Sequence, residues 1–299
     1  MSADWVTIGD GTLTAAVNPL GAELSSLTDA AGGEWMTDAD PAYWSGRSPL
    51  LFPIVGALNG GCYQLGGESY ALPQHGFARR RRFEQVERAA DAVRFRLTDD
   101  DETRAVYPFA FALDADYRIA DGALTIACTV TNRGAAPMPA SFGYHPAFAW
   151  PLPGEADKSG HAIRFDLPET SALARLEGGL IAGSDRPSPL AGDRRTLALN
   201  DALFEADALI WTGLASRAVT YAVPGGASLR VAFPDVDKLG IWTKQGARFM
   251  CIEPWWGLAD PAGFAGEFSD KPGVMTLQPD EARTFAMVLM PMAKSSQNG

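Results

Sequence analysis

Short segments in which apolar and polar residues alternate make up most of this 299-residue chain, and Gly, Pro, Asn and Asp separate them. A period of two is typical of β-strands that bury one face and expose the other. The pattern predicts strands at residues 13–17, 24–27, 93–97 and 124–130. Residues 284–290 are largely apolar, as expected for a strand in the middle of a sheet.

Turn residues join neighbouring segments into predicted hairpins. The expected pairs are residues 109–119 with 124–130 across Ala120-Asp121-Gly122, residues 219–223 with 229–233 across Pro224-Gly225-Gly226, and residues 239–243 with 249–253 around Gln245-Gly246. Hairpins pair their strands antiparallel, so the sheets of this protein are expected to be antiparallel.

Helical patterns are few and short, at residues 101–107 and 200–206. Residues 151–198 are rich in Gly, Pro, Asp and Ser, which predicts long loops that decorate a sheet. No long linker divides the chain, and no segment repeats at a fixed period. The sequence therefore predicts one all-β domain over residues 1–299, a large antiparallel β-sandwich with few short helices.

Composition and charge narrow the classes of protein to consider. Hydrophobic residues make up 46% of the chain without a run of about 18 apolar residues, so we expect a globular protein with no membrane partner. The net charge of -11 argues against nucleic acid as a partner. No signal-peptide pattern opens the chain, and Cys62, Cys128 and Cys251 are too scattered for a disulfide framework. Both observations predict a cytoplasmic location. The three cysteines are expected to be small core residues.

One local exception to the acidic balance is a run of four arginines at residues 79–82. Successive side chains of a strand point to opposite faces, so such a run would not face one ligand together. Arg88, Arg94 and Arg96 follow the run. Most of these seven arginines are expected to form a solvated face paired with Glu84, Glu87 and Asp91. One or two of them could still line a site for an anionic substrate.

Two histidines and one glutamate stand in unusual settings. His75 precedes Gly76 at a predicted bend, and His145 precedes Pro146, which favours an extended backbone. Glu253 ends a predicted apolar strand and is followed by a proline and two indoles, so partial burial should raise its pKa towards that of a general base. Taken singly, each histidine could equally be a structural residue and Glu253 a buried ion-pair partner.

Aromatic residues suggest the class of ligand. Most of them must belong to the core, but an indole ring also packs well on the C–H face of a sugar. Arg, Asp, Glu and His would then bind the hydroxyl rim. The tryptophans considered are Trp35, Trp44, Trp150, Trp242, Trp255 and Trp256.

Several motifs in order along the chain resemble the aldose 1-epimerase family, the galactose mutarotase-like proteins, and in particular its compact bacterial members. They are Asn18-Pro19-Leu20-Gly21-Ala22-Glu23-Leu24, Gly46-Arg47-Ser48-Pro49-Leu50-Leu51-Phe52-Pro53-Ile54-Val55-Gly56, Gln74-His75-Gly76-Phe77-Ala78-Arg79, Phe142-Gly143-Tyr144-His145-Pro146 and Cys251-Ile252-Glu253-Pro254-Trp255. The resemblance spans nearly the whole chain and implies the large β-sandwich (supersandwich) of that family.

The resemblance also implies roles for these residues in the interconversion of the α and β anomers of an aldohexose. Glu253 matches the general base that takes the proton of the C1 hydroxyl, and His145 matches the general acid that protonates the ring oxygen. His75 matches a second histidine that holds the sugar and stabilises charge at that oxygen. Expected substrate contacts are Arg47, Arg79, Gln74 and Trp255, together with an aspartate, for which Asp207 is the first candidate and Asp235 the second.

Anomer interconversion moves protons only, so no cofactor and no metal are expected, and the predicted partner is a small sugar bound by a monomer or homodimer. Three alternatives stay open. The substrate could be a hexose 6-phosphate held by the arginine run, or the chain could be a sugar-binding β-sandwich without catalysis. In the third, His75, His145 and Glu253 could form a facial triad around a metal.

Overall fold

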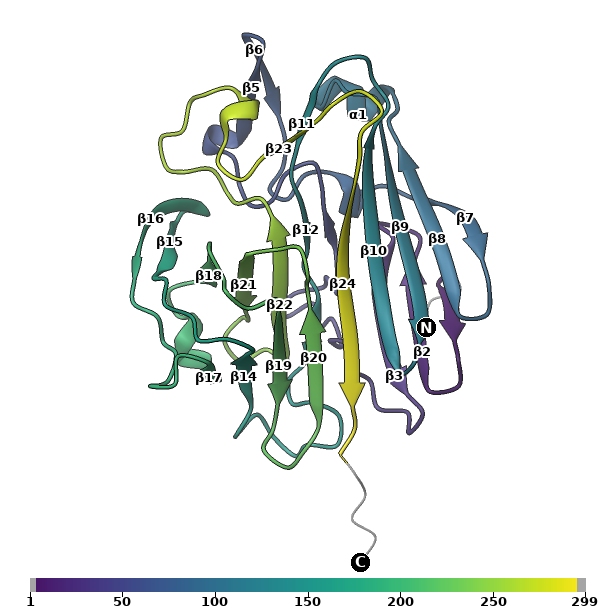
Figure 1. Cartoon of the computed structure of the whole chain (residues 1–299), viewed down its shortest axis with the longest axis vertical. Coiled ribbons are helices and arrows are strands. Elements are labelled where there is room, and N and C mark those ends of the chain that lie inside the picture. The colour runs from purple at the N-terminus through teal and green to yellow at the C-terminus, as the bar shows by residue number, and fades with distance from the viewer. Residues whose placement is uncertain (1–3, 295–299) are drawn as a thin grey trace, which may run out of the picture.

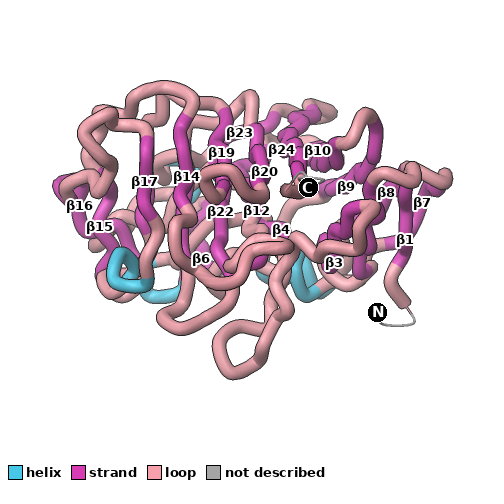
Figure 2. The backbone as a smooth tube through the Cα atoms, turned by 90° about the horizontal axis from the view of Figure 1, so that it is seen from below, coloured by secondary structure: helices cyan, strands magenta, loops and turns pink. Residues whose placement is uncertain are grey.

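A computed structural model describes residues 4–294 and shows two stacked layers of antiparallel sheet (Figures 1 and 2). This confirms the predicted all-β sandwich. Across the described residues, one layer is a nine-stranded sheet and the other is an eight-stranded sheet. Smaller sheets flank the two layers.

The nine-stranded sheet has the four strands predicted from residues 109–130 and 219–233 near its middle. In spatial order its strands are β17 (Thr196–Ala198), β14 (Ala162–Phe165), β19 (Ala218–Ala222), β20 (Ser228–Ala232), β24 (Ala282–Met292), β10 (Ala123–Asn132), β9 (Phe111–Ala120), β8 (Ala92–Thr98) and β7 (Glu84–Arg88). The closing strand β24 lies between β20 and β10, which confirms its predicted central place. The two hairpins predicted for these strands are present, because β9 pairs with β10 and β19 with β20. The third predicted hairpin, around Gln245-Gly246, is present in the other large sheet.

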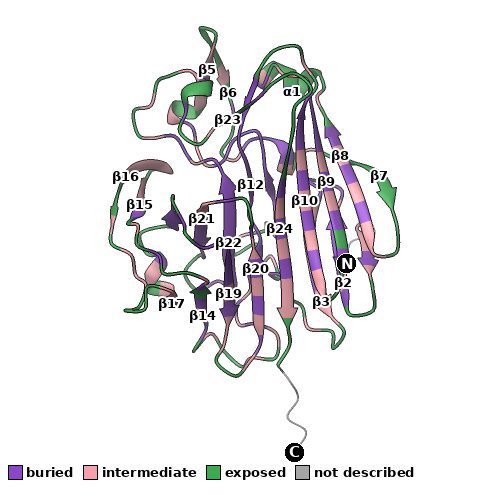
Figure 3. Ribbon diagram, in the orientation of Figure 1, coloured by how far each residue is buried: buried purple, intermediate pink, exposed green. Residues whose placement is uncertain are grey.

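The eight-stranded sheet has β22 at its centre. Its order is β16 (Leu180–Arg186), β15 (Leu173–Glu177), β18 (Leu209–Trp211), β21 (Lys238–Trp242), β22 (Phe249–Trp256), β12 (Phe142–Tyr144) and β4 (Leu50–Leu51), with β13 (Ala147–Ala149) also paired to β22. All eight residues of β22 are buried, and the strand runs as a continuous purple band in Figure 3. A strand covered on both faces can position a buried side chain rigidly.

The remaining elements close the edges and ends of the sandwich. They are β1 (Val6–Gly9), β2 (Leu13–Asn18) and β3 (Glu23–Asp29) in one sheet, the pairs β5 (Cys62–Leu65) with β6 (Glu68–Ala71) and β11 (Met138–Ala140) with β23 (Met275–Leu277), the helix α1 (Asp101–Val106), and the 3-10 turns η1 (Asn59–Gly61), η2 (Ala78–Arg80), η3 (Asp201–Phe204) and η4 (Phe268–Asp270). The helix α1 confirms the prediction for residues 101–107, and Asp100 caps it through Thr103. The second predicted helix is a short 3-10 turn, η3.

Aromatic contacts hold the two layers together. Phe142 of β12 stacks on Phe285 of β24, with ring centroids 5.0 Å apart. The Tyr144 hydroxyl, from β12, reaches across to the nine-stranded sheet, where it donates to the Phe285 carbonyl at 2.8 Å and accepts from the Cys128 amide at 3.2 Å. Burial of apolar side chains stabilises the sandwich, and this hydrogen bonding fixes the position of β12.

The structure differs from the sequence predictions in two places. Residues 151–198 are not loops throughout, because β14, β15, β16 and β17 lie there and extend both large sheets. These strands are three to seven residues long, and β16 contains Gly183 and Asp185, so their alternation is hard to recognise. Cys62 is half-buried rather than a core residue, whereas Cys128 and Cys251 are buried as predicted. Within residues 4–294, no helix is both long and apolar enough to cross a membrane.

Candidate active site

A cavity of about 300 Å³ lies against the eight-stranded sheet and collects residues that are distant along the chain. Seven of the eight site residues expected from the sequence line it, namely Glu253, His145, His75, Gln74, Arg79, Trp255 and Asp207. Arg47 does not. A cavity of this size, at the small end of the roughly 300–1,000 Å³ range of ligand pockets, suits a small ligand.

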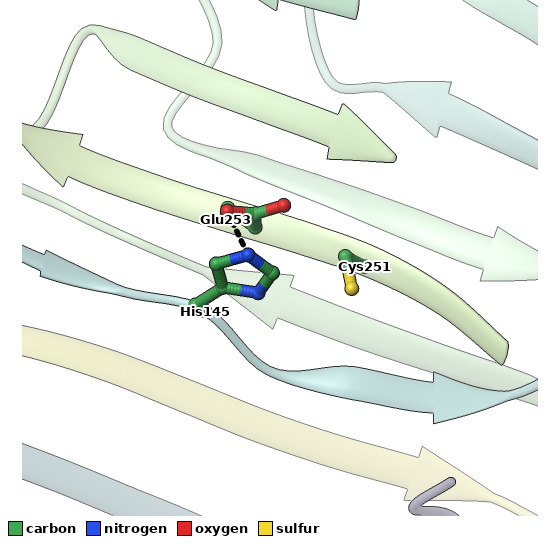
Figure 4. A group of neighbouring side chains, drawn as sticks. All are labelled: His145, Cys251 and Glu253. Carbon is green, nitrogen blue, oxygen red and sulfur yellow. Dashed lines mark ion pairs between the residues drawn. The ribbon is translucent and has the colours of Figure 1, made fainter. Parts of the chain in front are cut away.

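The register of the sheet brings His145 and Glu253 together. In the pairing of β12 with β22, Gly143 lies opposite Trp255, and in the pairing of β13 with β22, Ala147 lies opposite Cys251. The same register places His145 opposite Glu253. Figure 4 shows the two side chains facing each other, with His145 Nε2 3.2 Å from Glu253 Oε2.

Glu253 lies inside β22 and not at the end of a strand, which corrects the sequence prediction. The strand continues to Trp256, past the proline that suggested its end, and Gly240 of β21 pairs opposite Glu253. The exposed fractions are 2% for Glu253 and 8% for His145. Both side chains are therefore almost completely removed from water, apart from the face that they turn to the cavity.

Burial determines the charge of this pair. It raises the pKa of Glu253 well above 4.5, a shift that Trp255 opposes and Asp207 increases, and it lowers the pKa of His145. Both shifts favour a pair without net charge. A proton on the Glu253 carboxyl beside a neutral His145 satisfies both shifts, and transfer of that proton to the imidazole gives the ion pair, which also has no net charge.

His75 lies on the cavity wall in a conformation that Gly76 makes possible. Its φ is 67°, and a Cβ on Gly76 would come within 2.2 Å of the Phe52 carbonyl oxygen. His75 Nδ1 accepts from the Gly56 amide at 3.1 Å. A neutral imidazole that accepts at Nδ1 carries its proton on Nε2, so His75 can donate a hydrogen bond. Burial lowers the pKa of His75 well below 6.5, and His145 and Arg79 lower it further, which keeps the ring neutral.

Two glycines make room for Trp255 on the sheet. A Cβ on Gly240 would lie 2.6 Å from the Trp255 ring, and one on Gly143 would lie 2.8 Å from it. These strands flank β22 on its two sides, so the indole lies over neighbouring backbone where side chains are missing. Trp44 and Trp242 also line the cavity. Trp35 and Trp150, in contrast, are core residues with exposed fractions of 0% and 1%.

Asp207 lies at the exposed edge of the cavity, on a turn held by Arg186 of β16. The φ of Asp207 is 69°, in the left-handed region that Asp tolerates better than most residues. Arg186 donates to the carbonyls of Leu203, Ala206 and Ala208, each at 3.1 Å. The second aspartate considered, Asp235, is exposed and is not part of the cavity wall.

Arg47 requires a correction. Its guanidinium donates to the carbonyls of Thr37 at 2.6 Å, Asp38 at 3.2 Å and Ser25 at 3.2 Å. These contacts engage the guanidinium, and Arg47 is not among the residues that line the cavity. The resemblance to the family implied a sugar contact for Arg47, whereas the structure shows its guanidinium bound to carbonyls of the nearby backbone.

The arginine run also differs from the prediction, because Ala78–Arg80 is a 3-10 turn and not a strand. Arg79 points to the cavity and donates to the Gln74 carbonyl at 2.9 Å, while Arg81 pairs with Asp100 and Glu102. Arg80, Arg81 and Arg82 line a separate depression. A phosphate clamp made by the whole run is therefore excluded by geometry. Of the expected acidic partners, Glu87 pairs with Arg94 and Asp91 with Arg118.

The structure does not group His75, His145 and Glu253 as a set of possible metal ligands. Within residues 4–294, the group of possible ligands consists of His145, Cys251 and Glu253, whose donor atoms lie within 4.8 Å of one another (Figure 4). Cys251 is completely buried, and burial raises the pKa of its thiol well above 9.0. Metals bind the thiolate, so this protonated, inaccessible thiol fits a metal poorly.

A model of the aldose 1-epimerase family matches residues 4–175. The chain belongs to the aldose 1-epimerase family. Protein LacX (chromosomal) of Lactococcus lactis subsp. lactis is 31% identical over 277 residues, which are 89% of this chain and 92% of LacX. Membership supports a carbohydrate epimerase role.

Solved structures agree with this family assignment. A galactose mutarotase related enzyme from Lactobacillus acidophilus is similar with a TM-score of 0.92 and 30% identity, covering 98% of each chain. A galactose mutarotase-like protein from Lactobacillus casei gives a TM-score of 0.90 and 28% identity, covering 96% of this chain and 100% of that one. The galactose mutarotase-like sandwich predicted from the motifs is thus confirmed.

Sequence reasoning missed several residues of this aldose 1-epimerase cavity. Leu176 and Gly179 come from the β15–β16 hairpin, inside the region that was predicted to be loops. Ile210 and Ala259 also line the wall. None of these side chains is chemically distinctive, so no signal in the sequence could separate them from core residues.

Proposed function

We propose that this protein interconverts the α and β anomers of an aldohexose, with Glu253 as general base and His145 as general acid. The observation that carries the proposal is the buried pair itself, His145 Nε2 and Glu253 Oε2 at 3.2 Å on the wall of a cavity of about 300 Å³. Burial favours the form of this pair in which Glu253 carries the proton and His145 is neutral. The proposed roles use the other form without net charge, in which the same proton lies on His145 and leaves a carboxylate and an imidazolium. In that form a base and an acid face one ligand together.

The reaction needs one proton removed and one delivered. Glu253 takes the proton of the C1 hydroxyl while His145 gives its proton to the ring oxygen, so that the C1–O5 bond breaks and an aldehyde forms at C1. Rotation about the C1–C2 bond then exposes the other face of the aldehyde. The C5 hydroxyl adds to that face, its proton returns to His145, and Glu253 returns its proton to the new C1 oxygen. No electrons are transferred to or from the sugar.

The other cavity residues provide groups for holding the sugar. His75 carries a neutral Nε2–H, which can donate to the ring oxygen region without adding charge. Asp207 and Gln74 lie exposed at the edge of the cavity, where they can bind hydroxyls as the sugar enters. Trp255, with Trp44 and Trp242, offers apolar ring surface for the C–H face of the sugar.

Polarimetry tests this proposal. Freshly dissolved α-glucose, α-galactose and glucose 6-phosphate are followed with the wild-type protein, with E253Q, and with E169Q as a control. Glu169 is an equally buried glutamate that accepts from the Ala215 and Ser216 amides in another part of the fold. We expect E253Q to lose about 10²- to 10⁴-fold in turnover. Wild-type turnover in E253Q contradicts the proposal, and so does a wild-type protein that accelerates none of the three conversions.

The pH dependence of turnover provides a second test. Because burial raises the pKa of Glu253 above 4.5, the carboxylate is present above that raised value and is lost as the pH falls through it. Turnover should therefore decline on acidification with a midpoint above 4.5. A rate that stays constant from pH 8 down to pH 4 would contradict the role of Glu253 as base.

A hexose 6-phosphate is the second candidate substrate, and Arg79 is the observation that favours it. Its guanidinium lines the cavity, and its buried Nε has no hydrogen-bond partner among the described residues. A phosphate could satisfy this donor. Faster conversion of glucose 6-phosphate than of glucose, with a preference that disappears in R79Q, would select this substrate.

A further inference from the structure

The ring of Trp44 lies against the imidazole of His145 on the cavity wall. It belongs to the loop at residues 38–46, between β3 and β4. The centroids of its ring and of the His145 ring are 4.9 Å apart, and the two planes are inclined by 34°. Such a small inclination brings the face of the indole towards the imidazole. Phe249, with its ring centroid 5.6 Å away, supports Trp44 from β22.

Arg47 closes the loop that carries Trp44. The loop leaves at Thr37 and Asp38, and the Arg47 guanidinium at its other end donates to both of their carbonyls. The Arg47 amide also donates to Glu23 Oε1 at 2.8 Å. These contacts join the two ends of the loop, while Lys244 holds its middle by donating to the Tyr43 carbonyl at 3.2 Å. The motif residue Arg47 is therefore an anchor of the loop.

We propose that Trp44, on the loop closed by Arg47, is a positioning residue that stabilises the imidazolium form of His145. This rests on the proposed function, in which His145 must carry a proton to the ring oxygen. The face of an indole ring has negative electrostatic potential and attracts a cation within about 6 Å, most strongly where water is excluded. Trp44 thus favours the charged imidazole without placing another formal charge in the cavity.

The other groups around His145 show why such a contribution matters. Glu253, at 3.2 Å, favours the imidazolium, whereas Arg79 and the ring of His75, with its centroid 5.6 Å away, disfavour positive charge there. The Cys251 thiol is neutral. Burial opposes the imidazolium most strongly. Trp44, with its ring centroid 4.9 Å from that of the imidazole, opposes that effect of burial.

Nuclear magnetic resonance titration of the imidazole C–H signals measures His145 directly. The chain has three histidines, and single substitutions of His75 and His161 assign their signals. The variants are W44L, W44F and R47A, with R47K as the conservative rescue. Y43L is the matched control, because it removes an aromatic ring from the same loop and Tyr43 has no ring contact with His145 among the described residues.

We expect the His145 midpoint to fall by about 0.5–1 pH unit in W44L, by less in W44F, and to change little in Y43L. R47A should lower it and R47K should restore it. His161, which lies beside Tyr221, provides an internal control whose midpoint should not move. A His145 midpoint that is unchanged or higher in W44L overturns the proposal, since water entering the opened site would raise it. A wild-type His145 that stays neutral until the protein unfolds in acid overturns it equally.

Kinetics separate this proposal from the proposed function. The alkaline limb of the turnover profile, where the shared proton is lost, should move to lower pH in W44L and remain in place in Y43L. A KM change without movement of that limb would identify Trp44 as a sugar contact only and would overturn the positioning role. Wild-type turnover in E253Q, in contrast, contradicts the proposed function whatever the histidine titration shows.

Discussion

Replacement of Lys271 by methionine tests how the walls of the cavity are held. Lys271 Nζ lies 2.8 Å from Asp260 Oδ1 and donates to the Leu258 carbonyl at 2.6 Å, and the exposed fractions of the two side chains are 1% and 4%. Asp260 Oδ2 also accepts from the Asn59 amide at 2.8 Å. Methionine keeps the length of the side chain but removes its charge, so K271M leaves the Asp260 carboxylate buried without its cation.

Breaking one partner of a buried ion pair costs about 3–5 kcal/mol in free energy of unfolding. For a protein of this length, that corresponds to a fall of about 5–8 °C in the melting temperature, because the entropy of unfolding is about 2 cal/mol/K per residue. The assay is calorimetry and urea unfolding of K271M, D260N and the double variant. We expect the double variant to recover about 2–3 kcal/mol relative to the sum of the single variants.

The same pair should affect substrate binding. The Asp260 amide donates to the Ala57 carbonyl and its carbonyl accepts from Ile181, so Asp260 ties together the loops that bring Gly56 and Ala259 to the cavity wall. K271M should therefore raise KM more than it lowers kcat. A single variant within about 0.5 kcal/mol of wild type, or strictly additive effects in the double variant, would refute the reasoning.

Three further outcomes are expected. D207A should raise KM by about 10- to 100-fold with kcat largely kept, because hydrogen bonds to a charged group contribute roughly 1.5–3 kcal/mol. R186A should change KM in the same direction. Unchanged sugar affinity in both variants would contradict this expectation. Y144F should lower the free energy of unfolding by about 1–3 kcal/mol, because the buried Cys128 amide and Phe285 carbonyl lose the tyrosine hydroxyl as hydrogen-bond partner. A wild-type urea midpoint would contradict the claim that this hydroxyl links the two large sheets. E253Q should gain thermal stability relative to wild type as the pH rises from 4 to 8. The pKa of Glu253 is raised in the folded state, so ionisation of this carboxyl destabilises the folded wild-type protein above pH 4.5. A difference in melting temperature that does not depend on pH would contradict this expectation.

Much of the fold could be predicted because a strand with one buried face shows alternating apolar and polar residues in the sequence. Residues 93–97 and 124–130 alternate cleanly, and both are strands of the large sheet. The β15–β16 hairpin was missed because β15 is only five residues long and β16 contains glycine and aspartate, so neither shows a clear alternation. That omission also hid the part of the cavity wall that this hairpin provides.

The candidate site was predictable where the residue types were rare. His75, His145 and Glu253 stood out by their settings, and all three line the cavity. The sequence could not place Arg47, because whether a guanidinium meets a ligand or the nearby carbonyls depends on the path of the loop at residues 38–46. The division into a single domain, the cytoplasmic location and the monomeric or homodimeric state remain predictions.

The most direct measurement of the central claim is the turnover of H145N, of E253Q and of the double variant, each with its sugar affinity. Two residues that act as one acid–base unit give strongly non-additive losses. We predict that each single variant loses about 10²- to 10⁴-fold in kcat with little change in affinity, and that the double variant loses little more than the worse single variant. Losses that multiply in the double variant, or a single variant with wild-type turnover, would contradict the claim that His145 and Glu253 catalyse the reaction as a pair.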